Sequence, residues 1–301
     1  MPFIQLESLN IHYEQQDKGA IPIILLHGNF GSWHYWQPVL QNTPSGYCAY
    51  APDFRGCGDS QVTDDGYNVE TLCQDIIQFA DQLKLDKFHL VGHSLGGAVA
   101  QQLAGTMPDR IITLTLVAPA PACGLKRLQR LPKANTFFSA ENMFQFLEKI
   151  NIKRHIMSAS IKKSMPGLSE HLLIQAVDDA LKMDIRAFNG YLETLKIWTG
   201  LNLLKSFNFP VLIVYGELDN VISLADLQDM QKEISDCRLH IMQNIGHSPQ
   251  LENPKAFNKL LSAFLCGNKI ELTSEQIIRT KQLSLVAKAK LLLQRLLRNN
   301  S

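Results

Sequence analysis

Residues 87–98 read Lys87-Phe88-His89-Leu90-Val91-Gly92-His93-Ser94-Leu95-Gly96-Gly97-Ala98 and carry the strongest structural signal in the chain. The first half is a short apolar run, typical of a buried strand, and the second half begins a helix that we expect over Leu95 to Met107. Between them, Gly-x-Ser-x-Gly places Ser94 in a sharp strand-to-helix turn, where its hydroxyl stands clear of the sheet. The flanking glycines let the backbones approach without a clashing Cβ atom, and the helix directs its positive dipole end to the same place. This context predicts that Ser94 is a nucleophile and not an ordinary helix cap.

Short apolar runs like the one before Ser94 recur along the chain. They cover Ile21 to Leu26, Tyr47 to Ala51, Phe88 to Val91, Ile111 to Val117, Val211 to Tyr215 and Arg238 to Met242. Such runs are typical of a parallel sheet covered by helices, and helical periods lie between them at Asn68 to Leu83, Leu224 to Ile234 and Pro254 to Leu265. The first residues alternate apolar and polar positions, which predicts a hairpin that turns near Ser8-Leu9-Asn10. The fold class is therefore α/β, with a mostly parallel, doubly wound sheet flanked by helices.

The alternation of strands and helices stops between Pro119 and Phe209, where the spacing of apolar residues is helical throughout. We interpret this region as a helical lid, because the strand pattern resumes at Val211 as if uninterrupted. After the last predicted helix, the capping-box sequence Thr273-Ser274-Glu275-Gln276 opens a long basic amphipathic helix. The predicted organisation is a core at residues 1–119 and 206–266, a lid at 120–205 and a C-terminal helix at 267–301.

The composition excludes several classes of protein. A chain of 301 residues that is 46% hydrophobic and 19% charged is long and apolar enough for one large globular domain, and it contains no apolar stretch of transmembrane length. The N-terminal residues lack a basic segment followed by an apolar run, so we expect a cytoplasmic protein. Its six cysteines show no Cys-x-x-Cys spacing and its histidines show no His-x-His or His-Glu-x-x-His spacing. We therefore predict neither a metal site nor a cofactor.

The net charge of +1 conceals an uneven distribution. The lid region carries 13 basic and 7 acidic residues, and the C-terminal region carries 7 basic and 2 acidic residues, so the remaining body is acidic. A basic lid can steer anionic substrates such as thioesters of coenzyme A or of an acyl carrier protein, although a solvated basic face is the simpler interpretation. The C-terminal helix can bind an anionic membrane surface, but packing on the acidic body or homodimerisation is the preferred interpretation. Nothing in the charge pattern indicates a nucleic-acid partner.

Partners for a nucleophilic serine lie after other predicted strands. The run from Ile21 to Leu26 leads into a glycine-rich turn, and we expect the backbone amides of Asn29 and Leu95 to form an oxyanion hole. The next-to-last strand leads to Glu217 and Asp219, of which Asp219 is the preferred acid because it lies further into the loop. The last strand leads to His247, the expected base.

At these motifs the sequence resembles the α/β-hydrolase fold superfamily, in its capped single-domain form, over residues of about 1 to 266. Matching segments include His27-Gly28, Gly92 to Gly97, a turn from Asp53 to Ser60, and the segment from Gly246 to Pro254. The resemblance implies that Ser94, Asp219 and His247 act in that order along the chain as a catalytic triad. It also implies that Asp53 and Arg55 are structural. The dehalogenase and epoxide hydrolase branches use an aspartate nucleophile, so Ser94 argues against both.

The resemblance implies a serine hydrolase that forms an acyl-enzyme intermediate. We expect a small-molecule carboxylic ester or thioester substrate, with an apolar acyl group because the lid is rich in phenylalanine, methionine and leucine. Alternatives on the same scaffold are a carbon–carbon bond hydrolase, a cofactor-free haloperoxidase or perhydrolase, and a small-molecule receptor that does not turn over. The triad alone does not distinguish them.

The other histidines of the core are interpreted as non-catalytic. His12 and His34 are expected at the surface or at the start of a helix. His89, His93 and His240 are expected to be packed or hydrogen-bonded within the fold.

Overall fold

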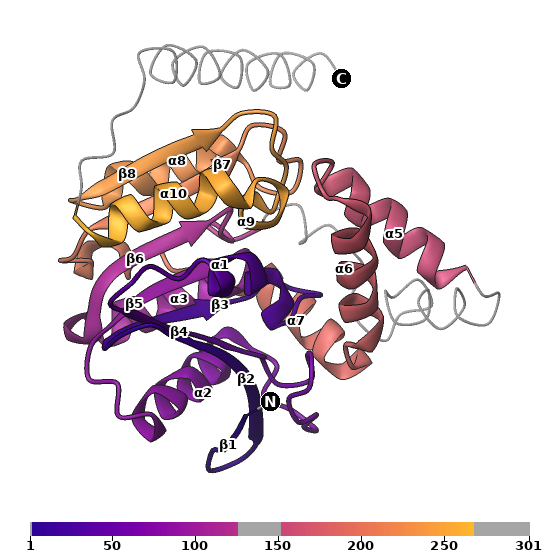
Figure 1. Ribbon diagram of the computed structural model, residues 1–301, viewed down its shortest axis with the longest axis horizontal. Helices are drawn as coiled ribbons and strands as arrows, with labels where there is room; N and C mark the ends of the chain where they lie inside the picture. The colour runs from indigo at the N-terminus through magenta and orange to yellow at the C-terminus, as the bar shows by residue number, and fades with distance from the viewer. Residues whose placement is uncertain (1, 126–151, 268–301) are drawn as a thin grey trace.

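An eight-stranded sheet forms the centre of the protein. The computed structural model describes residues 2–125 and 152–267 and orders the strands β1-β2-β4-β3-β5-β6-β7-β8 (Figure 1). The strands are β1 (Phe3–Gln5), β2 (Asn10–Asp17), β3 (Ile21–Leu26), β4 (Tyr47–Pro52), β5 (Phe88–His93), β6 (Ile111–Val117), β7 (Val211–Gly216) and β8 (Cys237–Met242). β2 pairs antiparallel with β1 and β4, and the pairs from β4 through β3 to β8 are parallel.

Helices cover both faces of this sheet. They include α1 (Gln37–Gln41), α2 (Val69–Gln82), α3 (Leu95–Thr106), α8 (Leu224–Glu233), α9 (Pro249–Glu252) and α10 (Pro254–Leu265), with 3-10 turns η1 (Trp33–Trp36), η2 (Pro108–Arg110) and η4 (Leu204–Ser206). Residues of α2, α3 and α8 share one buried cluster, and residues of α1 and α10 share a second one. Leu90 and Val91, adjacent in β5, fall in different clusters because successive strand side chains point to opposite faces.

The predicted fold class is confirmed. Every predicted apolar run forms a strand and every predicted helical period of the core forms a helix, with ends shifted by at most two residues. The hairpin of β1 and β2 also forms, with its turn over residues 6–9. The short helix α9 was not predicted, because four residues are too few to show a helical period.

The parallel strands bring their carboxyl ends to one edge of the sheet. Leu26 at the end of β3 pairs with Gly92 in β5, and Gly216 at the end of β7 pairs with Met242 at the end of β8. The segments that follow these four strands therefore leave the sheet at the same edge. In open α/β sheets this is the edge at which ligands bind.

Helices α5 (Lys153–Ser164), α6 (Glu170–Lys182) and α7 (Ile185–Ile197) lie between β6 and β7, and we call them the helical insert. Side chains of α7 join the main core cluster, whereas α5 and α6 form a separate cluster with Tyr35 and Leu251. In Figure 1, α5 and α6 project from one side of the core. Residues 126–151 of the predicted lid and the predicted C-terminal helix lie outside the described residues. No helix in the described ranges is long and apolar enough to cross a membrane.

Buried His89 makes the stability of the fold depend on pH. Its ring lies 2.8 Å from the Thr113 hydroxyl, and burial lowers its pKa from 6.5 to about 4. Between these values the unfolded chain binds a proton that the folded chain does not, so stability falls as the pH falls, by up to about 1.4 kcal/mol per pH unit. Between about pH 7 and about pH 5, His89 should lower the free energy of unfolding of the wild type by about 2 kcal/mol, and His89→Gln should lack this contribution. Urea denaturation of both proteins at the two pH values measures the difference. Equal losses in both proteins would contradict this assignment.

Candidate active site

Ser94 occupies a strained turn between β5 and α3. Its backbone has φ 52° and ψ −112°, a sparsely populated conformation that costs an L-residue about 1 to 3 kcal/mol. The surrounding backbone holds it there: the Ser94 amide donates to Val117 O at 3.1 Å, and the Ser94 carbonyl accepts from the amides of Gly97 and Ala120, each at 2.9 Å. The predicted strand, turn and helix are therefore present, with a strained and partly exposed serine at their junction.

Asp219 and His247 meet at the same edge of the sheet. The His247 Nδ1–H donates to Asp219 Oδ2 at 2.9 Å, and the Asp219 side chain is fully buried. The other carboxylate oxygen, Oδ1, accepts from the amides of Val221 and Ile222 at 2.7 and 3.1 Å. Because the loop fixes one oxygen, the other faces the imidazole. A proton held on Nδ1 leaves Nε2 of His247 free to accept one.

Glu217, the second acidic residue after β7, lies elsewhere. Its carboxylate accepts from the Asn244 amide at 3.1 Å and is not bonded to His247. Of the two acids considered from the sequence, the structure therefore pairs Asp219 with the histidine.

His93 links the serine segment to the histidine segment. The ring centroids of His93 and His247 lie 5.0 Å apart, and His93 Nε2–H donates to the His247 carbonyl at 3.0 Å. Burial, with a further contribution from His247, holds the pKa of His93 well below its usual value, so His93 is neutral. The Ser94 hydroxyl has no hydrogen bond to any described residue. A hydrogen bond between a nucleophile and its base is often long before substrate binds and shortens only in the complex.

The two predicted oxyanion donors have free amides. Neither the Asn29 amide nor the Leu95 amide donates to any acceptor in the described ranges. The neighbouring Phe30 amide, in contrast, donates to Asn29 Oδ1 at 3.0 Å. The turn that carries Asn29 lies against the serine, because a Cβ atom built on Gly28 would lie 3.1 Å from Ser94 Cβ. Backbone amides that are free to donate beside a serine hydroxyl can stabilise negative charge on a substrate oxygen.

His27 fixes that turn. Its Nδ1–H donates to the Gly28 carbonyl at 2.8 Å, and its Nε2 accepts from the Phe54 amide at 3.0 Å. Burial lowers the pKa of His27, which keeps the ring neutral and able to accept at Nε2. His27 is therefore structural.

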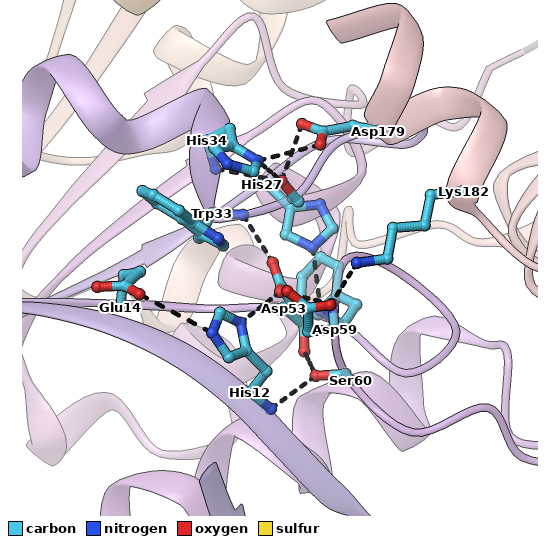
Figure 2. A network of polar contacts seen from close by, with 12 residues as sticks. His12, Glu14, His27, Trp33, His34, Asp53, Asp59, Ser60, Asp179 and Lys182 are labelled. Carbon is cyan, nitrogen blue, oxygen red and sulfur yellow. Dashed lines mark hydrogen bonds and ion pairs between the residues drawn. The ribbon is translucent and has the colours of Figure 1, made fainter. Parts of the chain in front are cut away.

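Asp53 is the centre of a buried polar network that fastens the segments next to this turn (Figure 2). Its carboxylate accepts from His12 Nδ1–H at 2.7 Å, from the Trp33 amide at 2.7 Å and from the Asp59 amide at 3.1 Å. The prediction of a surface position for His12 is wrong, because His12 is fully buried. His12 lies in a strand of alternating polar and apolar residues. This local pattern does not show that the Asp53 carboxylate, 41 residues away, accepts a hydrogen bond from the His12 ring. Asp53 is structural, as the resemblance implied.

Two side chains of helix α6 in the insert, Asp179 and Lys182, make polar contacts to the core (Figure 2). Buried Asp179 accepts from Ser32 Oγ at 2.8 Å and from His34 Nδ1–H at 3.0 Å. Lys182 pairs with Asp59, and this ammonium lowers the pKa of the Asp59 carboxyl. The insert is thus anchored beside the Asn29 turn.

A cavity of about 570 Å³ lies between the loop before α2 and helix α7, apart from the residues described above. Tyr67 and Trp198 contribute to its wall, together with the acidic residues Asp65, Glu70 and Glu193. None of the predicted site residues lines it. Within the described ranges, no group of three or more histidine, cysteine, aspartate or glutamate side chains is placed to hold a metal ion.

A parallel sheet with a strained serine, a buried acid–imidazole pair and unused amides at its carboxyl edge defines the α/β-hydrolase type of site. The sequence profile of the alpha/beta hydrolase fold family matches residues 21–254. The chain belongs to this family.

Relatives within the family differ in activity. The chain is 27% identical to a monoacylglycerol lipase of Homo sapiens over 81% of its own length and 75% of the relative's. It is 25% identical to 2-hydroxy-6-oxononadienedioate/2-hydroxy-6-oxononatrienedioate hydrolase 1 of Pseudomonas putida, over 85% of this chain and 92% of that one. The fold matches an esterase of Exiguobacterium antarcticum with a TM-score of 0.72 at 20% identity, over 87% and 98% of the two chains.

Two polar residues beside the site were not assigned a role from the sequence. Glu252 lies in the segment from Gly246 to Pro254 that resembles the family, which implies no role for it, and Asp179 lies in the insert without any motif. Asp179 contacts residues 145 and 147 positions away, so no local pattern announces it. The sequence signal for Glu252 is that it is the acidic residue nearest to His247 along the chain.

Proposed function

We propose that the protein is a serine hydrolase that cleaves a carboxylic ester or thioester by way of an acyl-enzyme intermediate. The observation that carries the proposal is the buried Asp219–His247 hydrogen bond of 2.9 Å at the same sheet edge as the strained Ser94. Asp219 orients the imidazole and stabilises its protonated form, and this leaves Nε2 as the proton acceptor.

The mechanism follows from these roles. Ser94 Oγ attacks the substrate carbonyl carbon while His247 Nε2 takes the hydroxyl proton, and the C=O electron pair moves onto the oxygen. The amides of Asn29 and Leu95 donate to that oxyanion. As the tetrahedral intermediate collapses, the bond to the alcohol or thiol breaks and His247 returns the proton to the leaving group. Water then attacks the acyl-serine with His247 as the base, which releases the acid and restores Ser94.

Aromatic side chains next to the Asn29 turn support an apolar acyl group. Phe30 is partly buried, and its ring centroid lies 5.3 Å from that of Phe188 on helix α7. This pair connects the proposed oxyanion turn to the insert. An apolar acyl chain that contacts it gains free energy through burial, at about 0.8 kcal/mol per methylene.

The charges of the insert support electrostatic selection of anionic substrates less than the aromatic pair supports selection of an apolar acyl group. Several of its cations are neutralised by carboxylates: Arg154 by Asp178, Lys182 by Asp59, Arg186 by Asp64 and Asp184, and Lys196 by Glu193. Paired cations contribute little long-range field. Hydrophobic selection of a neutral ester is therefore the favoured form of the proposal.

A panel of p-nitrophenyl esters and matching acyl-coenzyme A thioesters tests the substrate class. We expect kcat/KM for the esters to rise by about fourfold for each added methylene that is buried against Phe30 and Phe188. We do not expect a salt-sensitive preference for the thioester over the matching ester. A strong, salt-sensitive thioester preference would contradict selection by apolar contact and favour steering. A stoichiometric burst without turnover would indicate a receptor instead of an enzyme.

Carbon–carbon bond hydrolysis is the second candidate, favoured by the similarity to the Pseudomonas putida hydrolase over most of both chains. The same serine, base and oxyanion donors serve cleavage next to a ketone. A 2-hydroxy-6-oxo-dienoate added to the panel separates the two reactions. Turnover of this compound at a rate well above that of every ester would replace the ester proposal.

A further inference from the structure

The carboxylate of Glu252 accepts hydrogen bonds from the backbone amides on both sides of His247. Glu252 Oε2 accepts from the Gly246 amide, and Oε1 accepts from the Ser248 amide, each at 3.0 Å. Gly246 and Ser248 are the residues before and after His247. One side chain at the end of α9 therefore sets the backbone on which the imidazole is mounted.

The same carboxylate reaches the insert. Glu252 Oε2 also accepts from the amide of Gly167, in the turn after α5, at 2.9 Å. The His247 amide donates to the carbonyl of Ser164, the last residue of α5, at 2.8 Å. Insert residues thus bond directly to the histidine backbone and to the residue that clamps it.

The turn of the insert at residues 163–168, here called the insert turn, fits closely on this loop. A Cβ atom built on Gly246 would lie 2.4 Å from the Ser164 carbonyl oxygen and 2.6 Å from Pro166 Cδ, so only glycine permits the contact. Buried Met165 packs in one cluster with Leu251 of α9. The apolar contact and the hydrogen bonds hold the insert turn in one place.

The insert turn also bonds to the loop of the acid. Asn220 Nδ2, next to Asp219 in the chain, donates to the Lys163 carbonyl at 2.9 Å. The loops that carry Asp219 and His247 therefore both bond to a single turn of the insert.

We propose that Glu252 is a positioning residue that couples the insert turn to His247, so that the seating of the insert sets the orientation of the base. This inference rests on the proposed role of His247 as the base. Displacement of a catalytic group by about 1 Å can cost about 100-fold in rate. The insert then contributes to the chemical step as well as to substrate binding.

Glu252→Gln tests the coupling, since it hardly changes the size of the side chain but alters its hydrogen bonds. The amide retains one acceptor oxygen and places an NH₂ group against a backbone N–H. We expect kcat on the best p-nitrophenyl ester to fall by about 10- to 100-fold, with KM within about twofold of wild type. Gly167→Val crowds the carboxylate from the insert side, where a Cβ atom would lie 3.1 Å from Glu252 Oε2, and we expect the same pattern. In both variants, the low-field proton resonance of His247 Nδ1–H should shift or broaden.

Glu217→Gln is the matched control, because the Glu217 carboxylate accepts a hydrogen bond from the Asn244 amide in the same loop and, within the described residues, has no hydrogen bond to the insert turn or to the residues next to His247. We expect its kcat and its His247 resonance to match wild type. An unchanged kcat in Glu252→Gln, or in Gly167→Val alone, would overturn the coupling. If wild type shows no serine-dependent turnover, the proposed function fails, and the His247 resonance alone decides whether Glu252 and the insert turn position the ring.

Discussion

Ser94→Ala is expected to lower kcat for the best p-nitrophenyl ester by about 10³- to 10⁶-fold. In the proposed mechanism, the Ser94 hydroxyl oxygen forms the covalent bond to substrate, and alanine lacks this atom. The Asn29 and Leu95 amides remain, so some activity above the uncatalysed rate should persist through oxyanion stabilisation. The comparison of kcat for the purified variant and wild type, on the same ester, measures the effect.

The same substitution should leave the fold intact. Ser94 has φ 52°, and alanine has the same steric requirement there as serine, so the free energy of unfolding should change by less than about 1 kcal/mol. Equal stability with lost activity separates the chemical role of the hydroxyl from a structural one. If Ser94→Ala hydrolyses the ester at the wild-type rate, the serine is not the nucleophile.

Asp219→Asn is expected to lower kcat by on the order of 10⁴-fold, because it reverses the proton arrangement of the imidazole. Asp219 Oδ1 is held by the amides of Val221 and Ile222, so in the variant the amide oxygen stays there. The NH₂ group then faces His247 Nδ1, which must accept, and the ring proton moves to Nε2. Nε2 can no longer take the proton of the Ser94 hydroxyl.

Glu217→Gln provides the comparison, since Glu217 is the other acid after β7 and does not bond to His247. We expect kcat within about twofold of wild type, because its carboxylate holds only an exposed loop amide. Steady-state kinetics of the two variants side by side measure the difference. A larger loss in Glu217→Gln than in Asp219→Asn would reverse the assignment of the acid.

Most of the fold can be predicted from sequence because its signals are local. Buried parallel strands produce continuous apolar runs, and the helix α10 buries Phe257, Leu260, Leu261 and Phe264 at helical spacing. The strained Ser94 is also announced locally, since glycines must flank it. The fully buried His12 is not, because its alternating strand resembles an edge strand with one solvated face.

The site itself is only partly predictable. Each of Ser94, Asp219 and His247 follows its own apolar strand, and the common edge of a parallel sheet brings such positions together. The pairing of Asp219 rather than Glu217 with His247 depends on which carboxylate the loop amides capture, and that is a property of the folded turn. The contacts from Glu252 to Gly167 and from Asp179 to His34 join the insert to the core across long stretches of chain. No spacing in the sequence encodes them.

The most direct test of the proposed mechanism is peptide mass spectrometry of wild-type protein, acid-quenched during turnover of the best p-nitrophenyl ester. The mechanism predicts one acyl group per chain, carried by the peptide that contains Ser94, and absent from Ser94→Ala. Sustained turnover with no acylated peptide, or with the acyl group on another residue, would contradict the proposal that Ser94 is the nucleophile of a serine hydrolase.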